Sequence, residues 1–174
     1  RPDPIVGESR LPASAHEAFD PPKDHVTAPE ISMEFRIENL TEKILVGIHQ
    51  SMSYANNTTP ELWRRFMPRR KEVVNSLDSD LYSIQLYPAG TGPMSGDPGS
   101  VFEKWAAVEA IVPFSIPEGM EIINLPAGKY AVFLHHGPAS AFMKSFGFIF
   151  YDWLPGSEYL VDDRPHFEVL PGNY

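Results

Sequence analysis

Two glutamates lie within apolar stretches whose alternation is typical of β-strands. Glu168 is flanked by Phe167 and Val169, and Glu109 falls on the same side of its stretch as Trp105. A carboxylate that points inward loses its water, so it needs a cation or hydrogen bonds in compensation. The alternatives are an outward-facing Glu168, which the pattern alone favours, and a surface ion pair for Glu109.

Aromatic residues make up 12% of the chain, and several of them fall in strand-like stretches. The candidates for pocket walls are Tyr87, Trp105, Tyr130 and Phe133. An aromatic face attracts a cation by about 0.5 to 2 kcal/mol and accepts flat apolar groups, so such rings could surround a ligand. The alternative for each ring is an ordinary place in the hydrophobic core, which is the commoner role at this spacing.

The sequence gives little support to catalysis or metal binding. The absence of cysteine excludes disulfides, thiolate nucleophiles and iron–sulfur ligation. His135 and His136 point to opposite faces of a strand, and His166 with Glu168 supplies two metal ligands without a third. Neither a G-x-S-x-G nor an H-E-x-x-H motif occurs. We therefore predict no metal, no cofactor and no catalytic residue. The alternative is a hydrolase with Glu168 as general base for water and Tyr130 as proton donor.

The charge balance indicates which partners the chain attracts. A formal net charge of -9 and a pI near 5.1 oppose binding to nucleic acid and concentrate cations near acidic clefts. The basic run at 64–71 falls on one predicted helix, where a solvated face is favoured over a nucleic-acid or protein contact. No apolar stretch approaches the roughly 20 residues of a membrane span. We expect a cytoplasmic protein without direct nucleic-acid or membrane partners.

The elements that position these residues can be predicted from periodicity and turn signals. Strands are expected within 35–52, 81–87, 102–114, 119–137 and 165–170. Helices are expected from Pro60, with an interruption at Pro68, and over 140–155. The order strand, helix, strand, strand occurs once, and its first three elements recur. This order predicts an α+β fold of two tandem β-α-β-β halves, with an antiparallel sheet and a ligand cleft between them.

The N-terminal stretch differs from the rest in composition. Residues 1–31 contain six prolines and no sustained period of either 2 or 3.6. Such a stretch does not bury enough apolar surface to offset its ordering entropy. We therefore predict a poorly ordered leader or linker over residues 1–31 and one domain over residues 32–174.

Four strings of the sequence resemble the GyrI-like small-molecule-binding family, also called the AraC effector-binding domain family. They are ELWRRFMPRRKEV, FEKWAAVEA, PEGMEIINLPAGKYAVFLHHG and FIFYDWLPGSEYLVDDRPHFEVL. The resemblance covers about residues 35–170, and the WLP-x-S-x-Y-x-x-DDRP-x-FE run is its most specific part. It implies two tandem halves around a hydrophobic cleft that senses drugs or other amphipathic compounds. It also implies that Glu168 is the pocket glutamate.

The chain departs from the family pattern in two places. The sequence given ends at Tyr174, before the closing strand that we expect in the second half, so that half is either truncated or completed by another segment. Residues 1–31 are extra and could lie across the exposed edge or the cleft. The helix-turn-helix that many relatives carry is also absent from these residues.

The sequence as a whole predicts a receptor or sequestering protein for amphipathic, cationic molecules, with roles in multidrug recognition or transcription regulation of a bacterial type. The predicted ligand-binding residues are Glu168, Glu109, Trp105, Tyr130, Phe133 and Tyr87. The resemblance implies two alternatives, because some relatives hydrolyse reactive cyclopropane compounds and one branch protects DNA gyrase. A protein partner or a homodimer is compatible with either. A haem-binding version of the fold is a weaker alternative.

Overall fold

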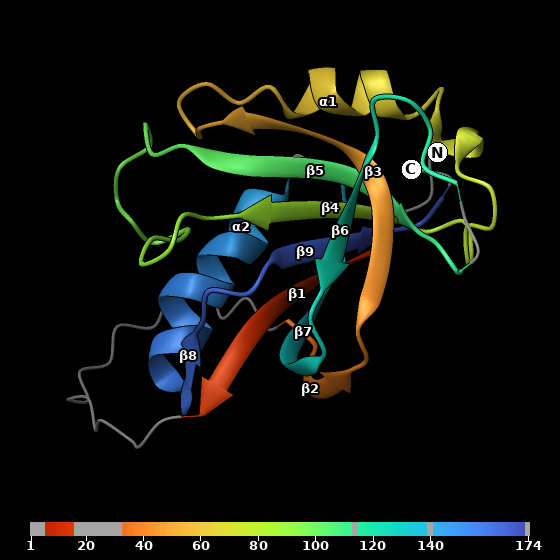
Figure 1. Cartoon of the computed structure of the whole chain (residues 1–174). Coiled ribbons are helices and arrows are strands. Elements are labelled where there is room, and N and C mark those ends of the chain that lie inside the picture. Colours follow the sequence, from red (N-terminus) through yellow and green to blue (C-terminus); the bar gives the residue numbers. More distant parts are fainter. Residues whose placement is uncertain (1–5, 16–32, 113–114, 139–140, 173–174) are drawn as a thin grey trace.

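The structure, a computed structural model, describes residues 6–15, 33–112, 115–138 and 141–172. Over these residues the chain forms one sheet of nine strands in which all neighbouring strands are antiparallel (Figure 1). The strands are β1 (Val6–Ala15), β2 (Phe35–Leu40), β3 (Lys43–Met52), β4 (Leu81–Leu86), β5 (Phe102–Glu109), β6 (Glu121–Leu125), β7 (Gly128–His136), β8 (Tyr159–Val161) and β9 (His166–Leu170). The predicted α+β class is confirmed.

The first helix, α1 (Thr59–Phe66), begins where the proline signal predicts. Pro60 lies in its first turn, where the missing N–H costs no hydrogen bond. The capping residue is Thr58, and its side chain makes no capping hydrogen bond. The α-helix ends before Pro68 and is followed by a short 3-10 turn, η1 (Arg70–Glu72). The predicted interruption at Pro68 is confirmed.

The second helix is continuous but changes its winding. It begins as α2 (Phe142–Gly147), widens into the π-helical segment η3 (Phe148–Trp153) and tightens into the 3-10 turn η4 (Leu154–Gly156). Its buried side chains include Ile149 and Phe150, and the Trp153 ring packs edge-on against Phe133 with centroids 4.8 Å apart. This helix is thus fixed to the sheet by its aromatic face.

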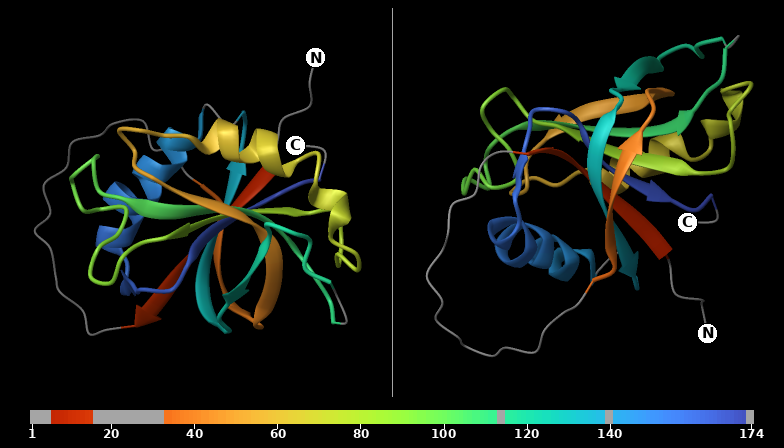
Figure 2. Two further views of the ribbon diagram at one scale, coloured as in Figure 1. Left: turned by 45° about the horizontal axis from the view of Figure 1, so that its top comes forward. Right: turned by 90° about the horizontal axis from the view of Figure 1, so that it is seen from below.

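The sheet has a symmetrical strand order, β2-β7-β1-β9-β4-β5-β3-β6. The first half supplies β4-β5-β3 and the second half supplies β7 and β9, and the two halves meet where β4 pairs with β9. The leading strand of each half pairs with the other half, because β2 lies beside β7 and β6 lies beside β3. These exchanged edge strands tie the halves into one sheet, whose twist is visible in Figure 2.

The strand β1 occupies the place in the second half that β5 occupies in the first. It lies between β7 and β9 and pairs antiparallel with both, just as β5 lies between β3 and β4 (Figure 1). The second half is therefore completed by another segment, which was one of the two expected possibilities. Residues 6–15 of the predicted leader form a strand inside the sheet. The remainder of the leader, 1–5 and 16–31, lies outside the described residues.

Both helices cover the same face of the sheet. In the register of the strands, Ala106 on β5 lies opposite Ser83 on β4, and Ser83 lies opposite Glu168 on β9. The row continues through Ser9 of β1 to Phe133 on β7. Residues paired across antiparallel strands share a face, so the core under α1 and the core under α2 lie on one side.

The opposite face carries a second core. It is formed by alternate residues of the same strands, among them Trp105, Tyr130 and Phe167, and the side chains of β6 complete it. The central strand β5 is thus buried on both faces. The sheet therefore separates two sets of side chains, one on the face that the helices cover and one on the opposite face.

Candidate functional site

Glu168 lies on the helix-covered face, between the part of the sheet under α1 and the part under α2. Its neighbours in the cross-strand row are Ser83 on one side and Ser9 on the other. The flanking residue Phe167 points to the opposite core and is 1% exposed, whereas Glu168 is partly buried. The acid that the family resemblance singled out is therefore held in the middle of the sheet, with part of its surface in contact with solvent.

Six ring side chains, which we call the aromatic belt, gather beside Glu168. They are Tyr54, Tyr87, Phe102, Phe146, Phe150 and His166. Consecutive members of the belt have centroids 4.5 to 6.4 Å apart. They come from β5, β9, the second helix and the segments that follow β3 and β4. The belt joins the two halves around one acid, an arrangement that can hold a flat apolar group next to a charge.

Two tyrosines of the belt present hydroxyls near the acid. The hydroxyl oxygens of Tyr54 and Tyr87 are 2.6 Å apart and share a hydrogen bond. Burial raises the pKa of Tyr54, and the negative charge of Glu168 raises it further against the opposing effect of the hydrogen bond. Burial is also the main cause of the raised pKa of Tyr87, and the neighbouring Tyr54 and Glu168 raise this pKa further. Both hydroxyls therefore stay protonated at neutral pH and can donate hydrogen bonds.

His166 is a neutral member of the belt. It is 6% exposed, and burial lowers its pKa to about 4 against a weaker opposing effect of Asp162. Its ring lies nearly parallel to Phe150 and edge-on to Tyr87. At neutral pH it therefore adds an uncharged polar ring to the belt.

Lys104 adds an ionisable amine to the helix-covered face. It is 4% exposed and alternates with Phe102 and Ala106, so it lies on the same side of the sheet as Glu168. Burial lowers its pKa, and the attraction of Glu168 works in the opposite direction. We expected a ligand cation to be the partner of Glu168, and Lys104 shows that the chain itself places an amine within electrostatic reach.

The predicted site residues divide between the two faces of the sheet. Tyr87 and Phe133 share the face of Glu168, although Phe133 is fully buried against Phe35 and Trp153. The other three, Trp105, Glu109 and Tyr130, lie on the opposite face. The six predicted residues therefore do not form one cluster.

Glu109 has partners of its own on the opposite face. Its Oε2 atom accepts hydrogen bonds from Lys43 Nζ and from the Tyr82 hydroxyl, both at 2.8 Å. Trp105 on the same face stacks on His49 with centroids 4.3 Å apart and donates from its indole nitrogen to Glu103. These contacts satisfy the polar groups within the fold, which is the role of a structural ion pair rather than of a ligand contact.

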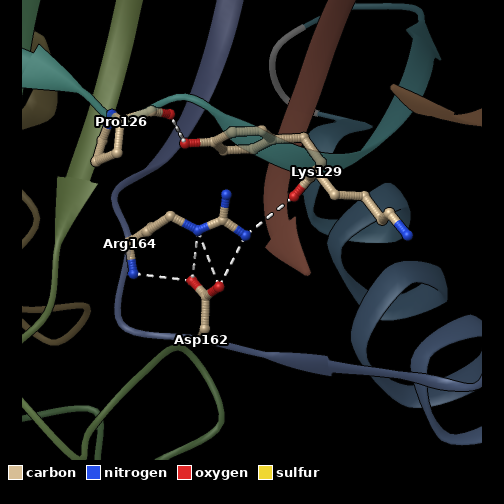
Figure 3. A network of polar contacts seen from close by, with 5 residues as sticks. Pro126, Lys129, Asp162 and Arg164 are labelled. Carbon is tan, nitrogen blue, oxygen red and sulfur yellow. Dashed lines mark hydrogen bonds and ion pairs between the residues drawn. The ribbon is translucent and has the colours of Figure 1, made fainter. Parts of the chain in front are cut away.

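Tyr130 takes part in a network that includes the DDRP motif, shown in Figure 3. Its hydroxyl donates to the Pro126 carbonyl oxygen at 2.8 Å, and the Arg164 guanidinium lies 4.6 Å from its ring centroid. Arg164 also binds both oxygens of Asp162 and the Lys129 carbonyl oxygen. Tyr130 is fully buried. The structure does not bring it beside Glu168, and this placement corrects the expected pairing of the two as acid and base.

The same network explains the glycine of the Pro-Ala-Gly turn. A methyl group at Gly128 would collide with the Arg164 guanidinium, so the arginine can approach the start of β7 only where the side chain is absent. Arg164 lies two residues before the start of β9 and thereby fixes the entry of the strand that carries Glu168. The most specific motif of the sequence thus positions the acid from the far side of the sheet.

The basic run on α1 and η1 is largely engaged locally. Arg65 donates to the Gln50 side chain, and Arg69 binds Glu72 through two nitrogens and the Glu118 carbonyl oxygen through one. Arg64 and Lys71 are exposed. The contacts agree with a solvated surface in which charges pair with near neighbours.

Neither a cluster of metal ligands nor a membrane-spanning helix is present in the part of the chain that the structure describes. In residues 33–112, 115–138 and 141–172, three or more histidine, aspartate or glutamate side chains do not come together in a way that could hold a metal ion. None of the helices in the described part of the chain has the length and apolar composition needed to cross a bilayer.

Sequence reasoning missed the amine and much of the belt. Tyr54 lies outside any strand or helix and gives no periodic signal. Phe102 and Lys104 alternate with Trp105 on β5, and that alternation could have grouped them. The pattern does not say which face carries the helices, because both faces of β5 are apolar.

An antiparallel sheet built from two halves, with a helix of each half on one face and an acid between them, defines an α+β ligand-binding domain. The chain belongs to the GyrI-like small molecule binding domain family, whose sequence model matches residues 33–174. The resemblance drawn from the sequence is thereby confirmed.

Curated relatives and solved structures agree with this assignment. The chain is 31% identical to the transcriptional regulator BrlR of Pseudomonas aeruginosa over 123 residues, which is 67% of this chain and 43% of that protein. It is 33% identical to a DNA gyrase inhibitor of Erwinia billingiae over 84 residues, or 44% of this chain and 54% of that protein. The chain therefore spans about half the length of these relatives.

Two solved structures share the fold. The integron cassette protein VCH_CASS2 of Vibrio cholerae superposes with a TM-score of 0.52 at 11% identity, covering 79% of this chain and 94% of that one. A bacterial transcription regulation protein of Staphylococcus aureus gives a TM-score of 0.51 at 14% identity, with coverage of 80% and 98%. At these identities the likeness concerns architecture alone.

Proposed function

We propose that this chain binds amphipathic small molecules on the helix-covered face of its sheet, as a receptor or sequestering module. The observation that supports the proposal best is the position of Glu168, which is partly buried beside the aromatic belt and between the two helices. A ligand with a flat apolar part would lie against the rings, and its polar part would meet the carboxylate and the tyrosine hydroxyls.

The preferred polar group of the ligand is a cation. Glu168 carries the negative charge of this face, and the belt offers ring faces that attract cations. The net charge of -9 favours the approach of cations from solution. Lys104 works against this preference only to the extent that it is protonated, and burial lowers its pKa. The ligand is thus expected to be a lipophilic amine rather than an acid.

The charge role of Glu168 can be tested with a matched pair of ligands. A naphthylalkyl ammonium ion and the corresponding alcohol have nearly the same shape and differ in charge. We expect Glu168→Gln to weaken binding of the ammonium ion by about 1.5 to 3 kcal/mol, the usual value of a charged hydrogen bond, and to change binding of the alcohol much less. Isothermal titration calorimetry measures both affinities. Equal weakening of the two ligands would contradict the charge role.

Glu109→Gln provides the control for this experiment. Glu109 is the other glutamate held among strands, but it lies on the opposite face and binds Lys43. The variant should lose stability while keeping the preference for the ammonium ligand. A loss of that preference in Glu109→Gln, with Glu168→Gln unaffected, would place the binding site on the other face of the sheet.

The hydrolytic alternative keeps Glu168 as the base but requires a different proton donor. Tyr130 lies on the other face, whereas the protonated hydroxyls of Tyr54 and Tyr87 interact electrostatically with Glu168. Incubation with a strained cyclopropane electrophile, followed by mass spectrometry, distinguishes the two functions. A hydrolase consumes many equivalents of the compound and loses turnover in Tyr87→Phe, whereas a receptor binds one equivalent and releases it unchanged.

A contact with DNA gyrase is a further role that the relative from Erwinia billingiae suggests by its name. The exposed Arg64 on α1 is a side chain available for such a contact. A pull-down with purified gyrase, using the parent chain and Arg64→Glu, tests it, and no binding by the parent would remove this role.

A further inference from the structure

Lys104 is the buried lysine among the described residues, and its amine has no hydrogen-bonding partner there. The residue is 4% exposed, and Nζ makes neither a hydrogen bond nor an ion pair with any side chain or backbone group that the structure describes. Every described side-chain nitrogen or oxygen that is sealed from solvent has a hydrogen-bond partner. Since Nζ has none, the atom keeps a small contact with solvent.

The other described lysines differ from Lys104 in this respect. Lys43 is paired with Glu109 at 2.8 Å on the opposite face. Lys71, Lys129 and Lys144 are exposed. One of these side chains is paired and the other three are solvated, so they provide an internal comparison for the reactivity of Lys104.

The surroundings of Lys104 favour an uncharged amine. Phe102 precedes it by two residues on the same face and belongs to the aromatic belt, and Ala106 follows it in the core under α1. In the register of the sheet its neighbours are Gln50 on β3 and Gln85 on β4. An ammonium ion in such a place loses hydration without a paired anion, so burial lowers the pKa of Lys104. A neutral amine is a nucleophile.

We propose that Lys104 forms an imine with aromatic aldehydes that lie against the aromatic belt, so that the site binds this class of ligand covalently and reversibly. The proposal rests on the function proposed above, because it uses the same face of the sheet. It adds a chemical class of ligand, the aromatic carbonyl compound, and a residue that binds it.

The chemistry needs no further reactant. The lone pair of Nζ attacks the carbonyl carbon, a carbon–nitrogen bond forms, and the carbonyl electron pair moves to oxygen. Proton transfer from nitrogen to oxygen gives a carbinolamine, and loss of one water molecule leaves the imine. The negative charge of Glu168 stabilises the protonated imine nitrogen in the same way that it favours protonation of Lys104. Water reverses the reaction and releases the aldehyde.

Reductive trapping tests the proposal on the whole chain. The protein is incubated at neutral pH with 2-naphthaldehyde and sodium cyanoborohydride, which reduces the imine to a stable secondary amine, and peptide mapping by mass spectrometry locates the label. We expect one equivalent at Lys104, formed faster than at Lys129 or Lys144, since a lowered pKa leaves more of the Lys104 amine unprotonated at neutral pH. Labelling of the exposed lysines with Lys104 unmodified would overturn the proposal, and this comparison requires no variant.

Variants separate reactivity from charge. Lys104→Met keeps an unbranched apolar chain in the same place, and Lys104→Arg places a permanently charged group there without a nucleophilic amine, so both should lose the fast label. Lys129→Met should retain it. A fast label that persists in Lys104→Met would assign the reaction to another amine.

The ammonium ligand of the previous section distinguishes failure of this inference from failure of the proposed function. If the ammonium ligand binds and Lys104 is not labelled, the receptor function stands and the imine is excluded. If both bind, the ammonium ligand should slow the labelling of Lys104 by competition. If Lys104 is labelled and the ammonium ligand does not bind, the amine is reactive and the cation-binding function is wrong.

Discussion

Lys43 and Glu109 form an ion pair, with Nζ and Oε2 2.8 Å apart, on the face of the sheet opposite Glu168. Both side chains are largely buried, and the Tyr82 hydroxyl donates to the same carboxylate oxygen. The chain thus holds two glutamates in strands of apolar pattern, β5 and β9, which lie on either side of β4, and uses them differently. One is neutralised within the fold, and the other remains available on the helix-covered face.

Removal of one partner of this pair should destabilise the protein. Lys43→Met leaves the Glu109 carboxylate largely buried with one hydrogen bond fewer, and we expect a loss of about 3 kcal/mol in the free energy of unfolding. Urea unfolding followed by circular dichroism measures it. The exposed pair Arg36 and Glu38 offers the comparison, since Arg36→Met should change stability by less than about 1 kcal/mol. Similar losses in both variants would mean that the Lys43 pair is not effectively buried.

The network around Arg164 should couple the start of β7 to the entry of β9. Arg164→Ala removes contacts to Asp162, to the Lys129 carbonyl oxygen and to the Tyr130 ring, for an expected loss of about 2 to 3 kcal/mol. Tyr130→Phe removes one hydrogen bond and should cost about 1 kcal/mol. Thermal or chemical denaturation of each variant gives the values.

Gly128 allows a sharper test of the same network. Gly128→Ala should be strongly destabilising in the parent and less so in the Arg164→Ala background, because the collision with the guanidinium is removed while the strain of a side chain at a φ of 151° remains. A double-mutant cycle measures this coupling. Additive effects would show that the backbone conformation of Gly128, rather than the close approach of Arg164, is what requires glycine.

The stability of the fold should fall between pH 6.5 and pH 4 because of His166. Burial lowers its pKa to about 4 in the folded chain, whereas an unfolded histidine titrates near 6.5. The unfolded state therefore binds more protons in this range, and stability decreases as the pH falls, by at most roughly 3 kcal/mol for this group. Urea unfolding at pH 7.5, 6, 5 and 4 follows the effect. His166→Gln should flatten the profile, and an unchanged slope in that variant would assign the effect to other groups.

The strand β1 should be required for a closed sheet. Deletion of residues 1–15 removes the partner of both β7 and β9 and leaves two unpaired strand edges in the middle of the sheet. We expect a lower melting temperature and association of the chain in size-exclusion chromatography. A peptide of residues 1–15 added in trans should restore the melting temperature by strand addition, and a peptide with Ser9→Pro should not. Full stability of the truncated chain would contradict the pairing.

Local patterns of the sequence were sufficient for most strands and for both helices. The alternation over 81–87 and 165–170 predicted β4 and β9, and the proline signals predicted where α1 begins and ends. Periodicity works here because these elements bury one regular set of side chains against the core.

The local sequence pattern does not predict which face of the sheet the helices cover. Alternation on β5 correctly groups Trp105 with Glu109, but it does not reveal that the helices lie on the side of Lys104. That choice depends on how the second half packs against the first. For the same reason Tyr130 was predicted to act as proton donor beside Glu168, although it lies on the opposite face of the sheet.

The composition of residues 1–31 also gives no indication of the strand β1. Residues 6–15 include Pro12, and the surrounding prolines indicate a segment without regular structure. The strand forms through pairing with β7 and β9, which are distant in sequence, so no local signal predicts it.

The distance along the chain between β1 and its partners has a consequence for biosynthesis. Ser9 pairs with Glu168, about 160 residues later, so a ribosome completes almost the entire domain before the first strand can find its place. Contacts of such long sequence separation close slowly. Until β1 has paired with β7 and β9, both strands present unpaired edges, and such edges promote aggregation.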